Sequence, residues 1–283
     1  MARWFVAGAA GMLGQDLGEV LEAAGHTVTR ADLPGLDILD PLRCMEQVAG
    51  HDVVVNSAAY TAVDAAETDE ARAFAVNAVG AANLARAARV AGAAMVQLST
   101  DYVVAGEGRQ PYDAHAPVAP ACAYGRTKAA GEWAVRAECP RSWVVRTAWL
   151  YGARGRSFPA TMRRLARERE RVAVVADQVG QPTWTVDLAE GIVRLVDAAA
   201  PFGIWHATGA GECSWFELAR AVFEELGLDP ERVDPVATQD YPLPAPRPAY
   251  SVLAHDMWAA AGLDPLPHWR DALHRAAPTV LAR

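Results

Sequence analysis

The sequence contains very little lysine. Of its 26 basic residues, Lys128 is the one lysine and the rest are arginines. Basic residues are outnumbered by 34 acidic ones, which leaves a formal net charge of −8. This balance argues against a nucleic-acid or anionic-membrane partner, because both are bound by basic surfaces that displace counterions. We therefore expect any anionic ligand to be held by a few local groups.

Cysteines, metal-binding motifs and long apolar runs are also scarce. The four cysteines lie far apart and form no C-x-x-C pair, so we expect free thiols and a cytoplasmic protein. The seven histidines show no H-E-x-x-H spacing, and there is no G-x-S-x-G motif. Neither a metal site nor a serine nucleophile is expected. No apolar run approaches the ~20 residues of a membrane span, and no membrane association is predicted.

The first half of the chain alternates short apolar runs with segments of helical periodicity such as Thr68–Ala91. The apolar runs are the one that ends at Val6, then Thr27–Arg30, Val53–Val55, Met95–Leu98 and Trp143–Val145. This repetition predicts an α/β fold with a Rossmann-type doubly wound parallel sheet. After about residue 150 the pattern is less regular, and residues 241–248 are too rich in proline for a helix or a central strand.

A G-x-x-G-x-x-G motif follows the first predicted strand directly and opens a predicted helix that begins at Met12. Its glycines permit a tight turn, and the helix N-terminus offers free N–H groups to a pyrophosphate. Together with the second strand, the motif predicts a dinucleotide site. The residues expected to face the dinucleotide here are Gly8, Gly11, Met12, Leu13 and Gly14.

Two residues near the end of the second strand give conflicting indications of the cofactor. Asp32 stands where an acid usually binds the ribose 2′-hydroxyl of NADH, whereas Arg30 could face the 2′-phosphate of NADPH. The sequence therefore does not decide between NADH and NADPH. Further candidates for cofactor contact follow the second and third strands: Asp37, Ile38, Ala58, Ala59 and Tyr60.

The strongest chemical signal is the pair Tyr124 and Lys128, which are four residues apart and share one helix face. A nearby ammonium lowers the pKa of a phenol, ordinarily about 10, and its remaining protons can bind ribose hydroxyls. A surface lysine lying over a ring is the alternative. We favour a catalytic pair, because lysine is not interchangeable with the arginine that this chain uses elsewhere. Thr100, after the fourth strand, could orient a substrate carbonyl beside the phenol.

Several longer motifs occur in order along the chain: Asn56–Asp64, Ser99–Val103, Arg146–Gly152, Asp177–Thr183 and Arg247–Leu253. With the glycine motif and the Tyr-Lys pair, they resemble the extended short-chain dehydrogenase/reductases and, within these, the dTDP-4-dehydrorhamnose reductase family. The resemblance implies a Rossmann domain over residues 1–150, with a returning segment near 176–205. Residues 151–283 would mainly bind a nucleotide sugar.

This resemblance implies hydride transfer from NADPH or NADH to C4 of dTDP-4-dehydro-β-L-rhamnose, giving dTDP-L-rhamnose. In that reaction Tyr124 protonates the C4 oxygen, Lys128 lowers the pKa of Tyr124 and holds the nicotinamide ribose, and Thr100 orients the carbonyl. The positions implied to contact the sugar nucleotide are Val63, Thr100, Asp101, Tyr102, Trp149 and Arg247.

Three other functions remain open: a ketoreductase for another dTDP-4-keto-6-deoxyhexose, a nucleotide-sugar epimerase, and a non-catalytic reductase-like regulatory subunit. Dehydration is disfavoured, because Tyr102 stands where similar dehydratases have a glutamate. Some members of the family form dimers through glutamate-bound Mg²⁺. This chain has no local glutamate cluster to support such a metal site, and a homodimer and the presence of Mg²⁺ in it stay open.

Overall fold

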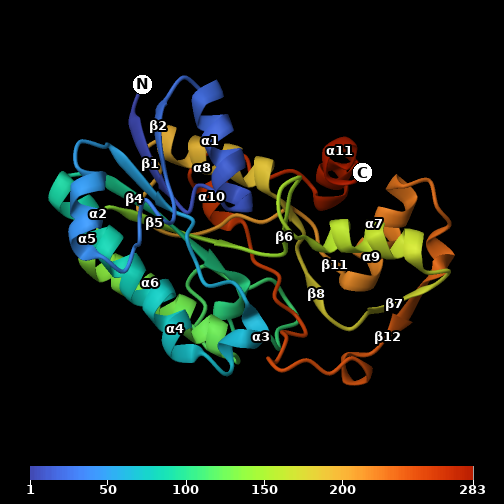
Figure 1. Ribbon diagram of the computed structural model, residues 1–283. Helices are drawn as coiled ribbons and strands as arrows, with labels where there is room; N and C mark the ends of the chain where they lie inside the picture. The colour runs from blue at the N-terminus through green and yellow to red at the C-terminus, as the bar shows by residue number, and fades with distance from the viewer. Residues whose placement is uncertain (283) are drawn as a thin grey trace.

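A six-stranded parallel sheet forms the centre of the computed structural model, which describes residues 1–282 (Figure 1). Its strand order is β10-β5-β4-β3-β1-β2. The strands are β1 (Arg3–Ala7), β2 (Thr27–Ala31), β3 (Val53–Asn56), β4 (Ala94–Thr100), β5 (Ser142–Thr147) and β10 (Gly203–His206). The predicted doubly wound α/β fold is confirmed.

Helices cover both faces of this sheet, because successive strand residues point to opposite sides. Trp4 and Val6 of β1 pack on one side, and Phe5 and Ala7 pack on the other. The first side is covered by α1 (Met12–Ala23), α8 (Thr185–Asp197) and α10 (Asp256–Ala260). The second is covered by α2 (Pro41–Val48), α5 (Ala81–Ala91) and α6 (Ala123–Glu138).

The helix predicted over residues 68–91 is not continuous. It consists of α4 (Glu70–Phe74), a π-helical stretch (Ala75–Gly80) and α5, and α3 (Val63–Ala66) precedes it. The π-helical stretch lies against α6, where a Cβ on Gly131 would come within 2.2 Å of the carbonyl oxygen of Asn77. π-Helical turns are rare and often occur near functional sites.

The C-terminal region has its own hydrophobic core and lies beside the sheet (Figure 1). It is built from α7 (Phe158–Glu168), β7 (Val172–Val175), α9 (Trp215–Glu225), β12 (Val233–Val236) and α11 (Trp269–Val280). Two short ladders connect its loops, β6 (Leu150–Tyr151) with β9 (Thr183–Trp184) and β8 (Val179–Gly180) with β11 (Cys213–Ser214). Three 3-10 helices complete the fold: Asp101–Val103, Pro230–Arg232 and Thr238–Asp240.

The chain returns from this region to the sheet, because α8 packs against α1 and β10 pairs with β5. The proline-rich residues 241–248 contain no helix or strand. Within residues 1–282, no helix is long and apolar enough to cross a membrane.

Candidate active site

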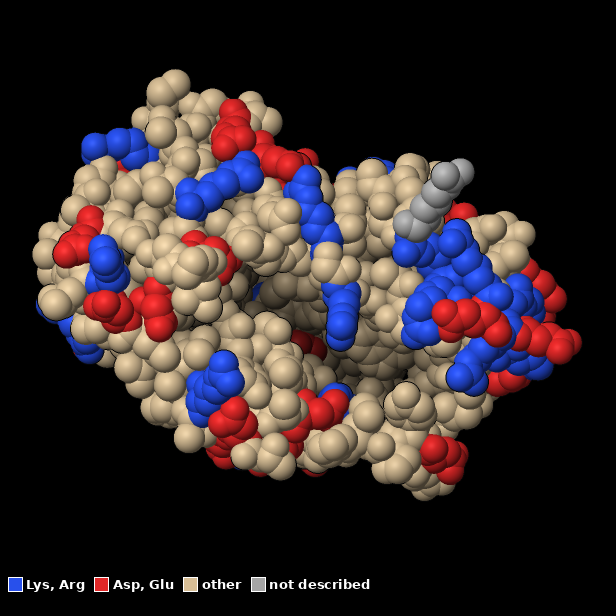
Figure 2. Space-filling model, viewed as in Figure 1, with Lys and Arg blue, Asp and Glu red and all other residues tan. Residues whose placement is uncertain are grey.

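A cavity of about 920 Å³ lies at the carboxyl ends of the central strands. Figure 2 shows it as a deep hollow between the two parts of the molecule. In open α/β sheets ligands bind at this edge, where the strand order reverses. Here the order reverses between β1 and β3. The cavity is therefore the place where the fold itself favours a ligand.

The glycine motif forms the end of this cavity beside β1. A Cβ on Gly8 would lie 2.4 Å from the amide nitrogen of Ala58, and a Cβ on Gly14 would lie 2.3 Å from the carbonyl oxygen of Gly8. Both positions therefore require glycine. Helix α1 begins after Gly11, and no side chain of the described residues caps its first N–H groups. Gly8, Gly11, Met12, Leu13 and Gly14 all line the cavity, so this helix end fits a pyrophosphate.

Asp32 and Arg30 point in different directions. Asp32 lines the cavity and accepts hydrogen bonds from the amide nitrogens of Ala10 and Leu33, each at 2.8 Å. Arg30 is not among the residues that line the cavity, because its guanidinium forms an ion pair at 3.0 Å with Glu22 of α1. The contact of Arg30 with the cofactor therefore stays a prediction, with the side chain held against α1 in this structure.

The loops after β2 and β3 line the same end of the cavity as the glycine motif, where the sequence predicts the cofactor. All five residues predicted there line the cavity: Asp37, Ile38, Ala58, Ala59 and Tyr60. The loop after β3 is fixed by Asn77, whose side-chain oxygen accepts from the amide of Tyr60 at 2.8 Å. The Asn77 amide group also donates to Thr127 of α6 at 3.0 Å. One buried side chain thus ties the cofactor loop to the helix that carries Tyr124 and Lys128.

Thr100 and Asp101 stand at the end of β4, in the middle of the cavity. The Thr100 hydroxyl donates to a carboxylate oxygen of Asp101 at 2.9 Å, and the hydroxyl of Ser251 donates to the other oxygen at 2.6 Å. Burial raises the pKa of Asp101 to about 6, against these two hydrogen bonds, which lower it. Asp101 therefore fixes the Thr100 hydroxyl and joins β4 to the segment that follows Arg247.

Tyr124 and Lys128 project from the first two turns of α6 into the same cavity. Burial, and second the charge of Asp101, raise the pKa of Tyr124 well above its usual value, while a hydrogen bond with Thr100 lowers it. Lys128 donates to the carbonyl oxygen of Leu98 at 2.6 Å.

Burial lowers the pKa of the Lys128 ammonium to about 8, and the charge of Glu132 opposes that shift. Glu132 lies one turn further along α6 and forms a two-pronged ion pair with Arg146 of β5, at 2.9 Å and 2.8 Å. Both side chains of the pair are at most 2% exposed. Ser99 of β4 also donates to Glu132, so this pair joins α6, β4 and β5 one helical turn from Lys128.

The opposite wall of the cavity is aromatic. Trp149, which has a positive φ of 46°, stacks on Trp215 with ring centroids 3.5 Å apart and an angle of 8° between the planes. Tyr102 meets Tyr124 edge to face at 5.7 Å. Val63, Tyr102 and Trp149, which the resemblance places at the sugar, all line the cavity.

Arg247, the remaining predicted substrate contact, is not among the residues that line the cavity. Its guanidinium donates to Asp64 of α3 at 2.8 Å and to the carbonyl oxygen of Ala245 at 3.0 Å. The ion pair fastens the proline-rich segment to α3, next to Val63. In this geometry Arg247 holds a neighbour of the cavity and does not reach into it.

Sequence reasoning missed further residues that line the cavity, among them Thr147, Arg156 and Trp215. The Thr147 hydroxyl is buried at the end of β5 without a hydrogen-bond partner in the described chain. Thr147 lies within a motif that carries the resemblance and could have been found there. Arg156 and Trp215 gave no signal, because they belong to the less regular second half and reach the cavity only through the tertiary fold.

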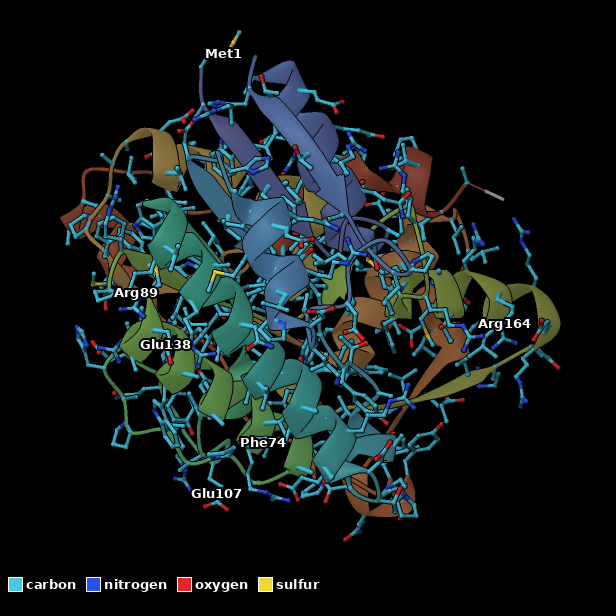
Figure 3. The ribbon with its side chains drawn as sticks, turned by 60° about the vertical axis from the view of Figure 1, so that its left-hand side comes forward. Met1, Phe74, Arg89, Glu107, Glu138 and Arg164 are labelled. Carbon is cyan, nitrogen blue, oxygen red and sulfur yellow. The ribbon has the colours of Figure 1, made fainter. Side chains whose placement is uncertain are left out.

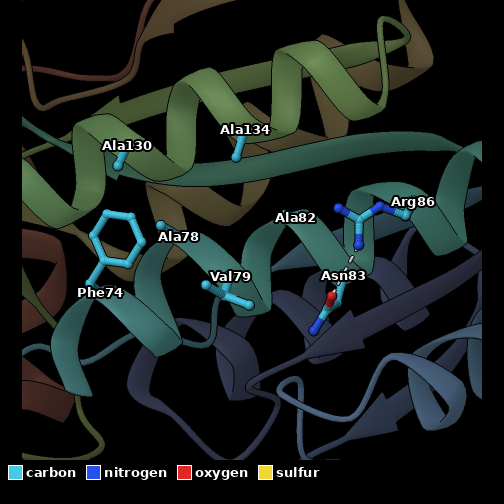
Figure 4. Close-up of a pocket in the computed structure, with 8 residues that line it drawn as sticks. All are labelled: Phe74, Ala78, Val79, Ala82, Asn83, Arg86, Ala130 and Ala134. Atoms are coloured by element: carbon cyan, nitrogen blue, oxygen red, sulfur yellow. Dashed lines mark hydrogen bonds between the residues drawn. The ribbon is translucent and has the colours of Figure 1, made fainter. Parts of the chain in front are cut away.

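A second, shallower hollow of about 220 Å³ lies between α5, α6 and the π-helical stretch (Figure 4). Its lining is mostly apolar, and its one charged residue, Arg86, donates to Asn83. Figure 3 shows Phe74, which lines this hollow, on the outer side of the helices. Because this hollow has no converging polar groups, the large cavity is the candidate active site. Among residues 1–282 there is also no group of His, Cys, Asp or Glu side chains that could hold a metal ion.

Comparison with known proteins adds independent information. The family model described as the RmlD substrate binding domain matches residues 2–281. The chain is 49% identical to a dTDP-4-dehydrorhamnose reductase of Streptomyces griseus, over 99% of this chain and 95% of that protein. It is 48% identical to a probable dTDP-4,6-dihydroxy-2-methyloxan-3-one 4-ketoreductase of Streptomyces antibioticus, over 99% and 96%. The crystal structure of dTDP-4-dehydrorhamnose reductase from Bacillus anthracis in complex with NADP has a TM-score of 0.94 and 38% identity, over 97% and 98%.

Proposed function

The chain belongs to the RmlD substrate binding domain family, and we propose that it reduces the C4 ketone of dTDP-4-dehydro-β-L-rhamnose to dTDP-L-rhamnose. It is an oxidoreductase that uses NADH or NADPH, and its substrate is a dTDP-sugar. The bound nicotinamide supplies the hydride. The observation that carries the proposal is that Thr100, Tyr124 and Lys128 line the same cavity of about 920 Å³ as the stacked Trp149 and Trp215.

Tyr124 is the proton donor in this proposal. Its raised pKa keeps the phenol protonated at neutral pH, so it can give a proton to the C4 oxygen as negative charge develops there. Thr100 orients the carbonyl from beside it, while its own hydroxyl proton is donated to Asp101, which holds the Thr100 side chain in place. The Lys128 ammonium stabilises the phenolate that remains and binds the nicotinamide ribose.

The proposal divides the chain between two ligands. Residues 1–150, joined by the returning segment near 176–205, hold the dinucleotide against the α1 N-terminus. Residues 151–283 mainly hold the nucleotide sugar. Within the described chain Arg156 lines the cavity and forms no ion pair, so its guanidinium is available to a diphosphate. The stacked Trp149 and Trp215 offer an apolar face to the sugar or the base.

The proposal also includes a cytoplasmic location of the protein and its assembly as a homodimer. The four cysteines are free and buried, which fits the reducing cytoplasm. A homodimer is supported by the hollow of Figure 4, where Phe74 and Val79 are exposed, and by the exposed Trp133, which precedes the lining residue Ala134 on α6. The ion pairs Arg126–Glu70 and Arg86–Glu138 place positive and negative charges on this surface. The same surface of a second copy can therefore be complementary to it in charge.

The test is oxidation of NADH and of NADPH in the presence of dTDP-4-dehydrorhamnose made in situ. We expect turnover by the wild type and a loss of at least ~10²-fold in Tyr124→Phe, with unchanged cofactor affinity. The Streptomyces antibioticus relative makes another dTDP-4-ketosugar the second candidate substrate. Reaction of that sugar alone would move the proposal to this substrate, and no oxidation of either cofactor with either sugar would contradict it.

A further inference from the structure

The loop between β6 and α7, residues 152–157, lies against the beginning of α1. A Cβ on Gly152 would come within 2.4 Å of the Thr185 hydroxyl and within 3.1 Å of the Met12 side chain. Gly155 has a positive φ of 83°, and a Cβ there would contact the methyl group of Met12 at 3.6 Å. Met12 lines the cavity at the glycine-motif end. A loop from the second half of the chain therefore packs on the helix that belongs to the other end of the cavity.

Arg154 fastens this loop to α1. Its guanidinium donates to Asp16 at 2.9 Å and, through another nitrogen, to Glu19. Asp16 is only 6% exposed, and its other oxygen accepts from the hydroxyl of Thr185 in α8. A buried carboxylate requires such partners, because an unpaired charge away from water is costly. The contact is therefore stronger than an ordinary surface pair, although the Arg154 side chain is itself 34% exposed.

The same loop carries Arg156 to the cavity. Among the lining residues of the described chain, Arg156 is the one basic residue that comes from beyond residue 150. The backbone is fixed on both sides of it, by Arg154 on α1 and by Ser157, whose side chain accepts from the amide of Ala160 at the start of α7. The planar fork of a guanidinium binds phosphate oxygens in a defined geometry, so the direction of this side chain matters.

From these contacts we infer that Arg154 is a positioning residue, which holds Arg156 at the cavity for the diphosphate of the dTDP-sugar. The inference rests on the proposed function and deepens it. Arg154 is not among the residues that line the cavity, so it acts through the loop. By tying the loop to Asp16, it limits the conformations that the backbone beside Arg156 can adopt. Less conformational entropy is then lost when Arg156 binds the diphosphate.

The experiment measures the dissociation constant of dTDP by calorimetry, with NADH present, for the wild type, Arg154→Met, Arg156→Met and the double variant. We expect Arg156→Met to bind dTDP at least ~10-fold more weakly, because it loses a charge-assisted contact, and Arg154→Met at least ~3-fold more weakly. Because Arg154 acts through Arg156, the double variant should bind no more weakly than Arg156→Met alone. Arg164→Met, which breaks an exposed ion pair on α7, is the matched control and should bind dTDP like the wild type.

A further variant separates positioning from stability. Arg154→Met leaves the buried Asp16 charge without its arginine, which can destabilise the fold. Combining it with Asp16→Asn removes both charges, and this pair of substitutions should fold and bind dTDP as weakly as Arg154→Met. In turnover, the KM for the dTDP-sugar should rise while kcat stays within ~2-fold of the wild type, because the contact with the diphosphate is made equally before and during the reaction.

Unchanged dTDP binding when the Arg154–Asp16 contact is removed would overturn the inference and leave the reductase proposal intact. The same conclusion would follow if the free-energy losses of Arg154→Met and Arg156→Met added up in the double variant, since the two arginines would then act independently. Failure of the wild type to bind dTDP while it binds NADH would instead overturn the proposed function, and this inference with it.

Discussion

Lys128, the one lysine of the chain, is buried at the cavity with 4% of its surface exposed. Burial of an ammonium is costly, and its pKa falls to about 8 because of it. A lysine in such a place suits a role that needs a compact cation with several donors, one of which already binds Leu98. Because every other basic residue is an arginine, the composition alone singles out this position.

The first prediction concerns Lys128→Arg. We expect the variant to bind NADH and to lose at least ~10²-fold in kcat, because a planar guanidinium cannot take the ammonium's place beside Tyr124. Arg126→Lys, two residues away on the same helix and paired with Glu70 at the surface, is the control and should keep full activity. Steady-state kinetics and thermal unfolding report the result. A fully active Lys128→Arg would remove the lysine from the mechanism.

The second prediction concerns pH. Asp101 has a pKa of about 6 and holds Thr100 when it is ionised, so kcat/KM should fall as the pH drops through about 6. Lys128 has a pKa of about 8 and acts as a cation, so kcat/KM should also fall as the pH rises through about 8. In Asp101→Asn the acidic limb should disappear while the alkaline limb stays. An acidic limb that persists unchanged in this variant would assign it to another group.

Residue identities in the cavity could be predicted where local motifs carry them. Every predicted residue except Arg30 and Arg247 lines it. Those two lie outside the lining because an arginine side chain is long, and its direction is decided by partners elsewhere in the fold, Glu22 and Asp64. A single sequence does not contain that information.

At the scale of elements, α6 is held to the sheet by the buried Glu132–Arg146 pair. The third prediction is that Arg146→Met destabilises the protein by about 3–5 kcal/mol, because it leaves the Glu132 charge buried without its partner. Arg126→Met, which breaks an exposed pair on the same helix, should cost less than about 1 kcal/mol. Urea unfolding at neutral pH measures both. Equal effects of the two variants would contradict this assignment.

Strands and most helices could be predicted from periodicity, because their apolar residues recur at the spacing that the sheet faces require. The π-helical stretch within residues 68–91 could not. Its alanine-rich sequence continues the helical pattern, and the irregularity arises where Gly131 of α6 approaches Asn77. Packing between two helices decided that detail, not local propensity.

In the whole molecule the glycine motif and the aromatic wall line one hollow, which Figure 2 shows. The returning segment, with α8 and β10, brings the chain from the second half back onto the sheet. The sequence indicated such a return, but it did not indicate which residues of the second half would face the cavity.

The fourth prediction tests assembly. Trp133→Arg should convert a homodimer into a monomer, because it puts a charge beside the apolar surface of Figure 4. Tyr241→Arg is the control, since Tyr241 is as exposed as Trp133, at 59%, but lies outside this helix pair. Analytical ultracentrifugation gives the masses. A wild type that is monomeric at all concentrations, or a dimeric Trp133→Arg, would contradict the proposed interface.

The central claim is reduction at C4 of the sugar, and isotope transfer tests it most directly. The measurement uses NADH deuterated at C4 of the nicotinamide, with dTDP-4-dehydrorhamnose and the wild-type enzyme, and locates the label by NMR. We predict deuterium at C4 of dTDP-L-rhamnose in the wild type and at least ~10²-fold slower labelling with Tyr124→Phe. Deuterium at any other carbon, or a sugar released without deuterium, would contradict the account.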